Sequence, residues 1–389
     1  MPNCAHLPLV RWCLLRQACG AGFVESIIHC TEPMTAALSP SATAAVHWAD
    51  DTRRAAFDAW LADVAPRHGL QPATLCPASA DASFRRYLRI DGADASYIVM
   101  DAPPAHEDVR PFVHIAALMH AAGLNAPVVV EQSAEQGFLL LSDLGSRLYL
   151  DELQAAVKSA DDATVTRLMR DAVAALLVWQ QQVDASSLPP YDEALLRREM
   201  QLFPDWCVER EYGQTWTDTQ QAHWKASTDL LVQSALSQAT VAVHRDYMPR
   251  NLRVCTPNPG ILDFQDAVRG PISYDPASLL RDAFISWDEE QEIDWAVRYW
   301  EQAKKAGLPV PTDFGEFWRQ LEWMGLQRHL KVLGIFCRLK HRDGKAKYSG
   351  DLPRFFRYAH HVASRYNGLG PLARLLEPLM GETRTDVYF

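Results

Sequence analysis

The sequence predicts an α+β fold with two lobes, the first rich in strands and the second mostly helical. Five short strand-like segments and one amphipathic helical pattern occupy residues 47–145, whereas long helical patterns dominate residues 146–389. A chain of 389 residues with 48% hydrophobic content is also too long for one compact core and long enough for two packed units.

The first lobe begins with a helical pattern over residues 48–69, in which apolar residues recur at helical spacing and a glycine closes the run. An amphipathic helix is expected from about Glu107 to Ala122, between the third and fourth strand-like segments. The five segments are TLCPA (74–78), SFRRYLRI (83–90), SYIVM (96–100), APVVVEQ (126–132) and GFLLLSDLG (137–145).

The second lobe shows helical patterns interrupted by three strand-like breaks. The sequence contains no internal repeat and no low-complexity linker, so the boundary near Gly145 is predicted to be a tight hinge. The helical patterns cover residues 163–183, 193–211, 219–238, 273–287, 289–307 and 314–344, and the breaks are TVAVH (240–244), LRVC (252–255) and GILDF (260–264).

Charge and cysteine content exclude several classes of protein. The formal net charge of -10 argues against a nucleic-acid or acidic-membrane binder, because either would need a basic field to gather phosphates. No apolar run approaches the roughly 20 residues that a bilayer span requires. The 8 cysteines are scattered without a CxxC pair, which is typical of reduced thiols in a cytoplasmic protein. We therefore expect a soluble cytoplasmic protein.

Residues 1–46 are predicted to be a disordered extension. Arg11 and Arg16 interrupt its apolar stretches, which makes a poor signal-peptide core. Met34 is followed by small residues that resemble an ordinary unstructured start, so a wrongly assigned upstream start codon would account for the extension.

The segment VHRDYMPRNLRV, residues 243–254, is the strongest candidate for chemistry. A polar loop whose side chains cap their own backbone is the ordinary interpretation of such a composition. His244, Arg245 and Asp246, with Asn251 five residues after the acid, also have the kinase spacing H-R-D-x-x-x-x-N. In that motif the Asp accepts the hydroxyl proton and the Asn holds magnesium, while the His is expected to brace the loop.

Asp263 stands twelve residues after Asn251, at the end of a short apolar strand, where a second metal ligand is expected. The segments LRVC and ILDF can pair as a hairpin through TPNPG, which would bring Asn251 and Asp263 side by side. This ordered pair on a hairpin favours a phosphotransferase over a plain polar loop.

Together with ASFRRYLRI, MDAPP and GFLLLSDLG, this block resembles the aminoglycoside phosphotransferase and choline kinase superfamily over about residues 47–366. Within it, the sequence is most similar to the bacterial anomeric kinases of N-acetylmuramate and N-acetylglucosamine. The resemblance implies a bilobal protein-kinase-like fold, ATP and Mg²⁺ as cofactors, and α-1-phosphate products in peptidoglycan recycling. A kinase of another small alcohol, such as choline, homoserine or an aminoglycoside, and a nucleotide-binding pseudokinase remain alternatives.

The resemblance also implies roles for individual residues. Asp246 would be the catalytic base that meets the acceptor, and Asn251 and Asp263 would be the magnesium ligands. The backbone of Ser142, Asp143 and Leu144 would meet the adenine. Ser79 and Ser83 lie where the phosphate-covering loop belongs, although a plain turn fits their surroundings as well. Asp275 is expected to cap a helix and brace the loop.

One departure from the superfamily concerns the phosphates. The strand lysine that pairs with them is missing, and Met100 stands in its place. Arg85, Arg86 and Arg89 on the preceding strand are the nearest cations, and alternation puts Arg86 on the face opposite the other two. One of them is predicted to contact the phosphates. The alternative is that all three are exposed charges on the strand without a role in binding.

The acceptor is predicted to be a small-molecule amino sugar bound by a monomer, without nucleic acid or membrane. The lactyl carboxylate of N-acetylmuramate would require a cation, and the candidates are Arg198, Arg210, Arg281 and Arg338. The alternative for each of them is an ordinary charged residue on the surface, without a role in sugar binding.

Overall fold

A five-stranded antiparallel sheet builds the first lobe, in the order β1-β2-β3-β5-β4. The computed structural model describes residues 46–48, 50–80, 84–282 and 284–381, so the predicted extension lies outside the described residues except for Val46. All five predicted strand segments form strands of this sheet. They are β1 (Gln71–Ala80), β2 (Arg86–Asp91), β3 (Ser96–Asp101), β4 (Val129–Ser133) and β5 (Phe138–Ser142).

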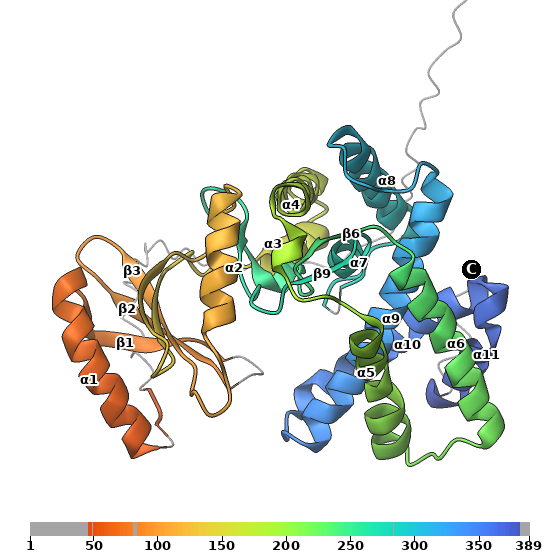
Figure 1. Ribbon diagram of the computed structural model, residues 1–389, viewed down its shortest axis with the longest axis horizontal. Helices are drawn as coiled ribbons and strands as arrows, with labels where there is room; N and C mark the ends of the chain where they lie inside the picture. The colour runs from red at the N-terminus through yellow and green to blue at the C-terminus, as the bar shows by residue number, and fades with distance from the viewer. Residues whose placement is uncertain (1–45, 49, 81–83, 283, 382–389) are drawn as a thin grey trace, which may run out of the picture. The chain divides into compact units, whose positions relative to one another are not determined.

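Helices cover both faces of the sheet (Figure 1). Helix α1 (Asp51–His68) buries Phe57 and Trp60 against one face, together with Leu140 of β5. Helix α2 (Arg110–Ala121) packs on the other face, where Leu139 and Leu141 of β5 point. Because successive residues of a strand alternate between faces, a strand that is apolar throughout fits a sheet covered on both sides.

Helix α2 begins later than the sequence pattern predicts, at Arg110 instead of Glu107. Residues 103–107 form a turn, in which the Glu107 amide donates to the Pro103 carbonyl. Asp108 then accepts a hydrogen bond from the Arg110 amide, at 3.0 Å, and Pro111 occupies the first turn. Proline is tolerated there because its missing N–H has no helical partner to lose.

The second lobe is helical, with short strands inserted between α6 and α7. The predicted boundary near Gly145 falls between the end of β5 and the start of α3. The helices are α3 (Tyr149–Lys158), α4 (Asp162–Gln182), α5 (Glu193–Leu202), η2 (Phe203–Glu211), α6 (Asp218–Leu236), α7 (Tyr274–Leu280), α8 (Glu289–Lys305), α9 (Phe314–His341), α10 (Leu352–Arg365) and α11 (Gly370–Leu376). Short helical turns are η1 (Ala185–Ser187), η3 (Pro249–Asn251), η4 (Ala346–Asp351), η5 (Asn367–Leu369) and η6 (Glu377–Leu379).

Two small antiparallel pairs complete the second lobe. Strand β6 (Thr240–Val243) pairs with β9 (Val268–Pro271), and β7 (Leu252–Arg253) pairs with β8 (Gly260–Ile261). The β7 and β8 pair is the hairpin that the sequence predicts. Strand-rich and helical regions are therefore segregated along the chain, which confirms the predicted α+β class.

The 28-residue helix α9 is the central element of the second lobe, and it packs against α5, α6, α7 and α10. A Cβ atom at Gly334 would come within 2.4 Å of the Leu202 backbone, so glycine permits α9 to lie directly against the end of α5. This close approach brings side chains of α5 and α9 together beneath the catalytic motif. Within the part of the chain that the structure describes, no helix is long and apolar enough to cross a membrane.

Candidate active site

The predicted catalytic motif, residues 244–251 with the H-R-D-x-x-x-x-N spacing, lies between the two small strand pairs. His244 follows the last residue of β6, and Asn251 closes η3 directly before β7. The Asn251 amide nitrogen donates to the Asp246 carbonyl at 2.9 Å and to the Asp263 carboxylate at 3.4 Å. Asp246, Asn251 and Asp263, which the sequence predicts to act together, are thus brought together by one loop and one hairpin.

The donor set of Asn251 and Asp263 fits a magnesium ion. Amide and carboxylate oxygens are ligands that hard cations prefer, and Mg²⁺ typically takes one or two carboxylates plus phosphate oxygens and water. Among the residues that the structure describes, no group of three or more His, Cys, Asp or Glu could hold a metal. Such an ion would take its further ligands from phosphate oxygens and water, as Mg²⁺ typically does.

Two residues of the site have strained backbones. Arg245 has a φ of 75° and Asp263 a φ of 62°, which places both in the left-handed region that favours glycine. Such conformations cost about 1–3 kcal/mol each and persist where the surroundings determine them. The strain falls on the residue before the predicted base and on a predicted metal ligand.

Asp275 braces this loop from helix α7. Its carboxylate accepts hydrogen bonds from the backbone amides of His244, at 2.7 Å, and Arg245, at 3.0 Å. Burial raises the pKa of Asp275 to about 7, although both amides favour its ionised form. The residue lies inside the first turn of α7, and Ser273 occupies the N-cap position, so the expectation of a helix cap is wrong while the bracing contact is present.

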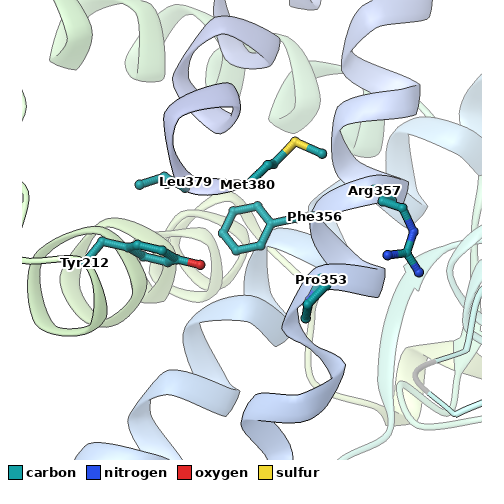
Figure 2. A pocket seen from close by; sticks show the side chains of 6 residues that line it. All are labelled: Tyr212, Pro353, Phe356, Arg357, Leu379 and Met380. Atoms are coloured by element: carbon teal, nitrogen blue, oxygen red, sulfur yellow. The ribbon is translucent and has the colours of Figure 1, made fainter. Parts of the chain in front are cut away.

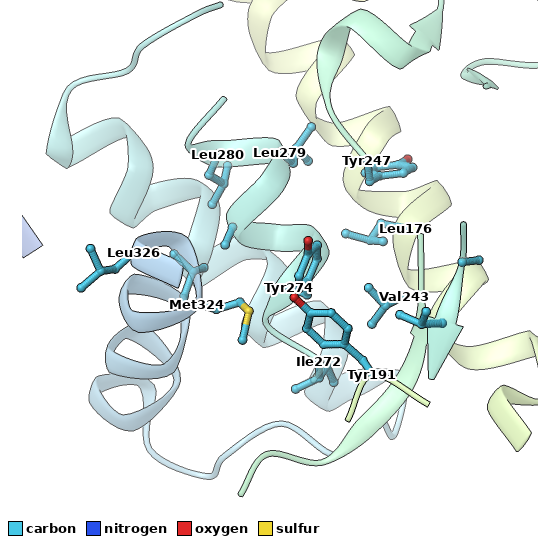
Figure 3. Packing of buried hydrophobic residues seen from close by; sticks show 14 of the residues in the cluster. Leu176, Tyr191, Val243, Tyr247, Ile272, Tyr274, Leu279, Leu280, Met324 and Leu326 are labelled. Carbon is cyan, nitrogen blue, oxygen red and sulfur yellow. The ribbon is translucent and has the colours of Figure 1, made fainter. Parts of the chain in front are cut away.

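His244 has the geometry of a structural residue. It is fully buried, and its Nδ1 accepts a hydrogen bond from the Asp246 amide at 3.2 Å. Burial lowers its pKa to about 4, so the ring is neutral near pH 7. Tyr247 anchors the same loop, because its hydroxyl donates to the Ala172 carbonyl at 2.8 Å. Figure 3 shows its ring within the packed core, near Leu176.

A buried polar network behind the loop was not anticipated from the sequence. Glu199 of α5 pairs with Arg245 and also accepts from Lys331 of α9, at 2.9 Å. Burial would raise the pKa of Glu199, but the charges of Lys331 and Arg245 outweigh it and hold the pKa at about 2. Tyr191 also donates to Glu199, and Arg328 of α9 donates to the Arg245 carbonyl at 2.7 Å.

A signal for this network exists in the sequence, since polar residues interrupt the apolar face of α9. Lys331 lies four residues after Gln327 and three after Arg328, which is helical spacing, and all three residues are buried. Buried charges of this kind are rare unless they are paired, so they mark a place where the fold supports a polar site.

Of the three strand arginines, Arg85 reaches the predicted metal ligands. Its Nη2 lies 3.5 Å from Asp263 Oδ1, and 11% of its side chain is exposed. Asp263 is further held by Gln265, whose amide donates to Oδ1 at 3.0 Å. Met100, at the position of the missing lysine, is buried in the core that contains α2. Arg85, which directly precedes β2, is therefore the one of these three arginines that is placed for a contact with phosphate.

Arg86 and Arg89 are engaged elsewhere. Arg86 lies on the opposite face, where it pairs with buried Asp101 and stacks on Trp48. This position does not fit the prediction that Arg86 binds the nucleotide, because strand alternation turns it away from Asp263. Arg89 shares the face of Arg85, but its Nε donates to Asp143 at 2.6 Å.

The predicted hinge continues directly from β5. Ser142 and Val128 exchange two hydrogen bonds, at 2.9 and 2.8 Å. Burial would raise the pKa of Asp143, but Arg89, Ser96 and the Gly145 amide hold it below its usual range. The Asp143 side chain is thus engaged in contacts within the hinge. The hinge backbone, residues 142–144, remains the part that could form hydrogen bonds to the adenine.

The predicted phosphate-covering loop is only partly described. Ser79 pairs with Tyr87 through the backbone in the β1 and β2 ladder. The Ser79 side chain and all of Ser83 lie outside the part of the chain that the structure describes.

The four arginines predicted to meet the sugar lie on α5, on η2, at the end of α7 and on α9. Arg198 on α5 and Arg210 on η2 are exposed. Arg281 is buried and neutralised by Glu292 and Glu322, at 3.1 and 3.2 Å, which does not fit a role toward an incoming carboxylate. Arg338 is half-buried on α9.

The Nε of Arg338 has no hydrogen-bond partner among the described residues, and burial lowers its pKa. Among these four arginines, Arg338 therefore has a donor that is both buried and without a partner among the described residues.

Two hollows of the second lobe lie apart from the catalytic motif. A cavity of about 770 Å³ is lined by Arg281, Trp287, Tyr358 and residues of α10, and no residue of 243–263 borders it. Figure 2 shows a second pocket, of about 50 Å³, between Tyr212 and Phe356. That volume holds only a few water molecules, so the pocket is too small for a sugar.

A model of the phosphotransferase enzyme family matches residues 74–314 of the chain. The chain is 50% identical over 337 residues to the N-acetylmuramate/N-acetylglucosamine kinase of Pseudomonas aeruginosa, covering 85% of this chain and 98% of that protein. It is 44% identical over 331 residues to the protein of the same name from Neisseria meningitidis, covering 85% and 97%.

Solved structures share the fold at low sequence identity. An ADP-bound aminoglycoside phosphotransferase, APH(2'')-Ib, superposes with a TM-score of 0.52 at 15% identity, over 77% of this chain and 97% of that chain. The choline kinase LicA of Streptococcus pneumoniae superposes with a TM-score of 0.54 at 11% identity, over 80% and 99%. The protein-kinase-like bilobal fold implied by the sequence is thereby confirmed.

Proposed function

Because the chain belongs to the phosphotransferase enzyme family, we propose that it is a magnesium-dependent kinase that moves the γ-phosphoryl group of ATP to N-acetylmuramate and N-acetylglucosamine. The observation that carries the chemistry is the joint placement of Asp246, Asn251 and Asp263. The names of the similar proteins support the choice of sugar. The acceptor atom is the anomeric oxygen, and the product is the α-1-phosphate.

The carboxylate of Asp246 acts as the base in this reaction. It accepts the proton of the sugar hydroxyl while that oxygen bonds to the γ-phosphorus and the bond to the bridging oxygen of ADP breaks. The peptide that carries Asp246 is held by the Asn251 amide and by the His244 ring. Positioning of this kind supplies much of the rate acceleration in phosphoryl transfer, because the protein forms no covalent bond to the transferred group.

Asn251 and Asp263 would hold Mg²⁺, which neutralises charge on the phosphate oxygens when it is bound. Arg85 adds a fixed positive charge beside Asp263 and takes the place of the missing strand lysine. The hinge backbone from Ser142 to Leu144 receives the adenine. The predictions of a monomer and of a cytoplasmic location belong to the same proposal.

The presence of Asp246, Asn251 and Asp263 argues against a nucleotide-binding pseudokinase. A scaffold that only binds the nucleotide has no need of a base and two metal ligands. A kinase of another small alcohol would use the same three residues. The acceptor therefore has to be found by experiment.

The experiment measures ATP consumption and sugar phosphate formation with both amino sugars, choline, homoserine and an aminoglycoside. The Asp246→Asn variant serves as the matched control for contaminating kinases. We expect turnover with the amino sugars and none with the cationic compounds. Turnover with choline or an aminoglycoside alone would contradict the sugar assignment.

A further inference from the structure

Arg245 stands next to the base and carries the strained backbone of the loop. Both of its backbone polar groups are bound by helices that are distant in sequence. Its amide donates to Asp275 of α7 at 3.0 Å, and its carbonyl accepts from Nη1 of Arg328 of α9 at 2.7 Å. The peptide planes on both sides of the strained residue are therefore fixed by side chains.

The side chain of Arg245 is held as well. Its guanidinium pairs with Glu199 of α5 and donates to the Asp266 carbonyl at 3.3 Å. Side chains of three helices, α5, α7 and α9, thus hold Arg245 in its left-handed conformation. The carbonyl that Arg328 binds belongs to the peptide that joins Arg245 to Asp246. A rotation of this peptide would turn the direction in which the Asp246 side chain leaves the backbone.

Burial would lower the pKa of Arg328, but Tyr274 and the carboxylates of Asp246 and Asp275 outweigh it and raise that pKa. The residue is 7% exposed, and its guanidinium lies 4.8 Å from the centre of the Tyr274 ring. Among the residues that the structure describes, it forms no ion pair within 4.0 Å. The two carboxylates act on Arg328 from beyond 4.0 Å, so the hydrogen bond to the Arg245 carbonyl is a direct polar contact between this buried guanidinium and the loop.

We propose that Arg328 is a positioning residue for phosphoryl transfer: by holding the Arg245 carbonyl it keeps the loop in its left-handed conformation and aims Asp246 at the acceptor hydroxyl. This inference rests on the proposed kinase function for its kinetic consequences, but its geometric content does not depend on the acceptor. The proposed role of the Arg328 guanidinium is exerted through the backbone of the loop.

The test is a double-mutant cycle between Arg328 and Arg245. Arg328→Met should lower kcat by about 100-fold with KM for ATP nearly unchanged, because a misplacement of about 1 Å at a reacting group costs on that order. Glycine adopts positive φ without strain, so in the Arg245→Gly background the same change at Arg328 should cost less than about fivefold. Arg319→Met, which removes a surface pair on the same helix, is the control and should leave kcat unchanged.

Additive losses in the two backgrounds would overturn the proposal, because they would show that Arg328 acts through its charge or through general stability. Crystal structures of the variants give a second, direct measurement. We expect the Arg245 backbone of Arg328→Met to leave the left-handed region, and a φ that stays near 75° with Asp246 unmoved would also overturn the proposal.

The cycle is measured with whichever alcohol the unmodified protein phosphorylates. A protein that phosphorylates none of the panel contradicts the proposed function, and the crystallographic comparison then decides the positioning role alone. If Arg328→Met does not fold, Arg328→Lys takes its place in both measurements, since it keeps a charge on α9 but lacks the planar guanidinium that lies over the Tyr274 ring.

Discussion

Replacing Arg85 with Met should weaken the binding of ATP much more than the binding of adenosine. The guanidinium lies 3.5 Å from Asp263 and is 11% exposed, so a phosphate bound beside Asp263 would meet it in a largely desolvated place. A hydrogen bond to a charged group is worth about 1.5–3 kcal/mol in such surroundings. This corresponds to a rise of about 10- to 160-fold in the dissociation constant of ATP.

Adenosine has no phosphate, so its affinity distinguishes the loss of a phosphate contact from damage to the hinge that receives the adenine. Arg89 shares the strand face of Arg85, but it supports Asp143 in the hinge. Arg89→Met should therefore weaken adenosine and ATP by similar factors, whereas Arg85→Met should leave adenosine within about twofold. Arg86→Met, on the opposite face, should change neither affinity and should lower the thermal stability, because buried Asp101 loses a partner.

Isothermal titration calorimetry with ATP, ADP and adenosine, at one fixed magnesium concentration, measures all three variants in the same way. Equal and small losses for the three arginines would refute the argument, and the phosphate charge would then have to be met by another group. A loss of adenosine binding in Arg85→Met would equally refute it, because the contact would not be to phosphate.

The remaining predictions concern the base, the sugar carboxylate and acid stability. Asp246→Asn should lose about 10²- to 10⁴-fold in kcat while ATP affinity measured by calorimetry stays unchanged, and near-full turnover would contradict its role as base. Arg338→Ala should cost about 1.5–3 kcal/mol in kcat/KM for N-acetylmuramate and little for N-acetylglucosamine, whereas Arg198→Ala and Arg210→Ala should affect the two sugars alike. Glu199 has a folded pKa of about 2, below its unfolded value, so its stabilisation is present above about pH 4.5 and is lost as the pH falls toward 2. Urea unfolding at pH 6 and pH 3 should therefore show a smaller acid loss in Glu199→Gln than in the unmodified protein, and equal losses would contradict the lowered pKa.

The sequence by itself determined the strand-rich and helical halves and the group of Asp246, Asn251 and Asp263. Hydrophobic periodicity is a local property, so all five strands of the sheet could be predicted from it. The three site residues lie within 18 positions of one another, and a hairpin between β7 and β8 closes the distance. Contacts of such short range can be read from spacing alone.

The tertiary structure decided which arginines face the site. The strand pattern of the sequence predicts that Arg85, directly before β2, and Arg86, its first residue, point in opposite directions, but the choice of face depends on which helix packs on which side of the sheet. The four arginines proposed for the sugar had no local constraint at all, and one of them, Arg281, is neutralised by carboxylates of α8 and α9.

The network around Arg245 was also decided by the tertiary structure alone. Glu199 precedes Arg245 by 46 positions and Arg328 follows it by 83. Their meeting depends on the close approach of α9 to α5 at Gly334 and on the packing of α7 against α9. Helical periodicity predicts which residues share a face, but only the packing of whole helices determines what that face meets.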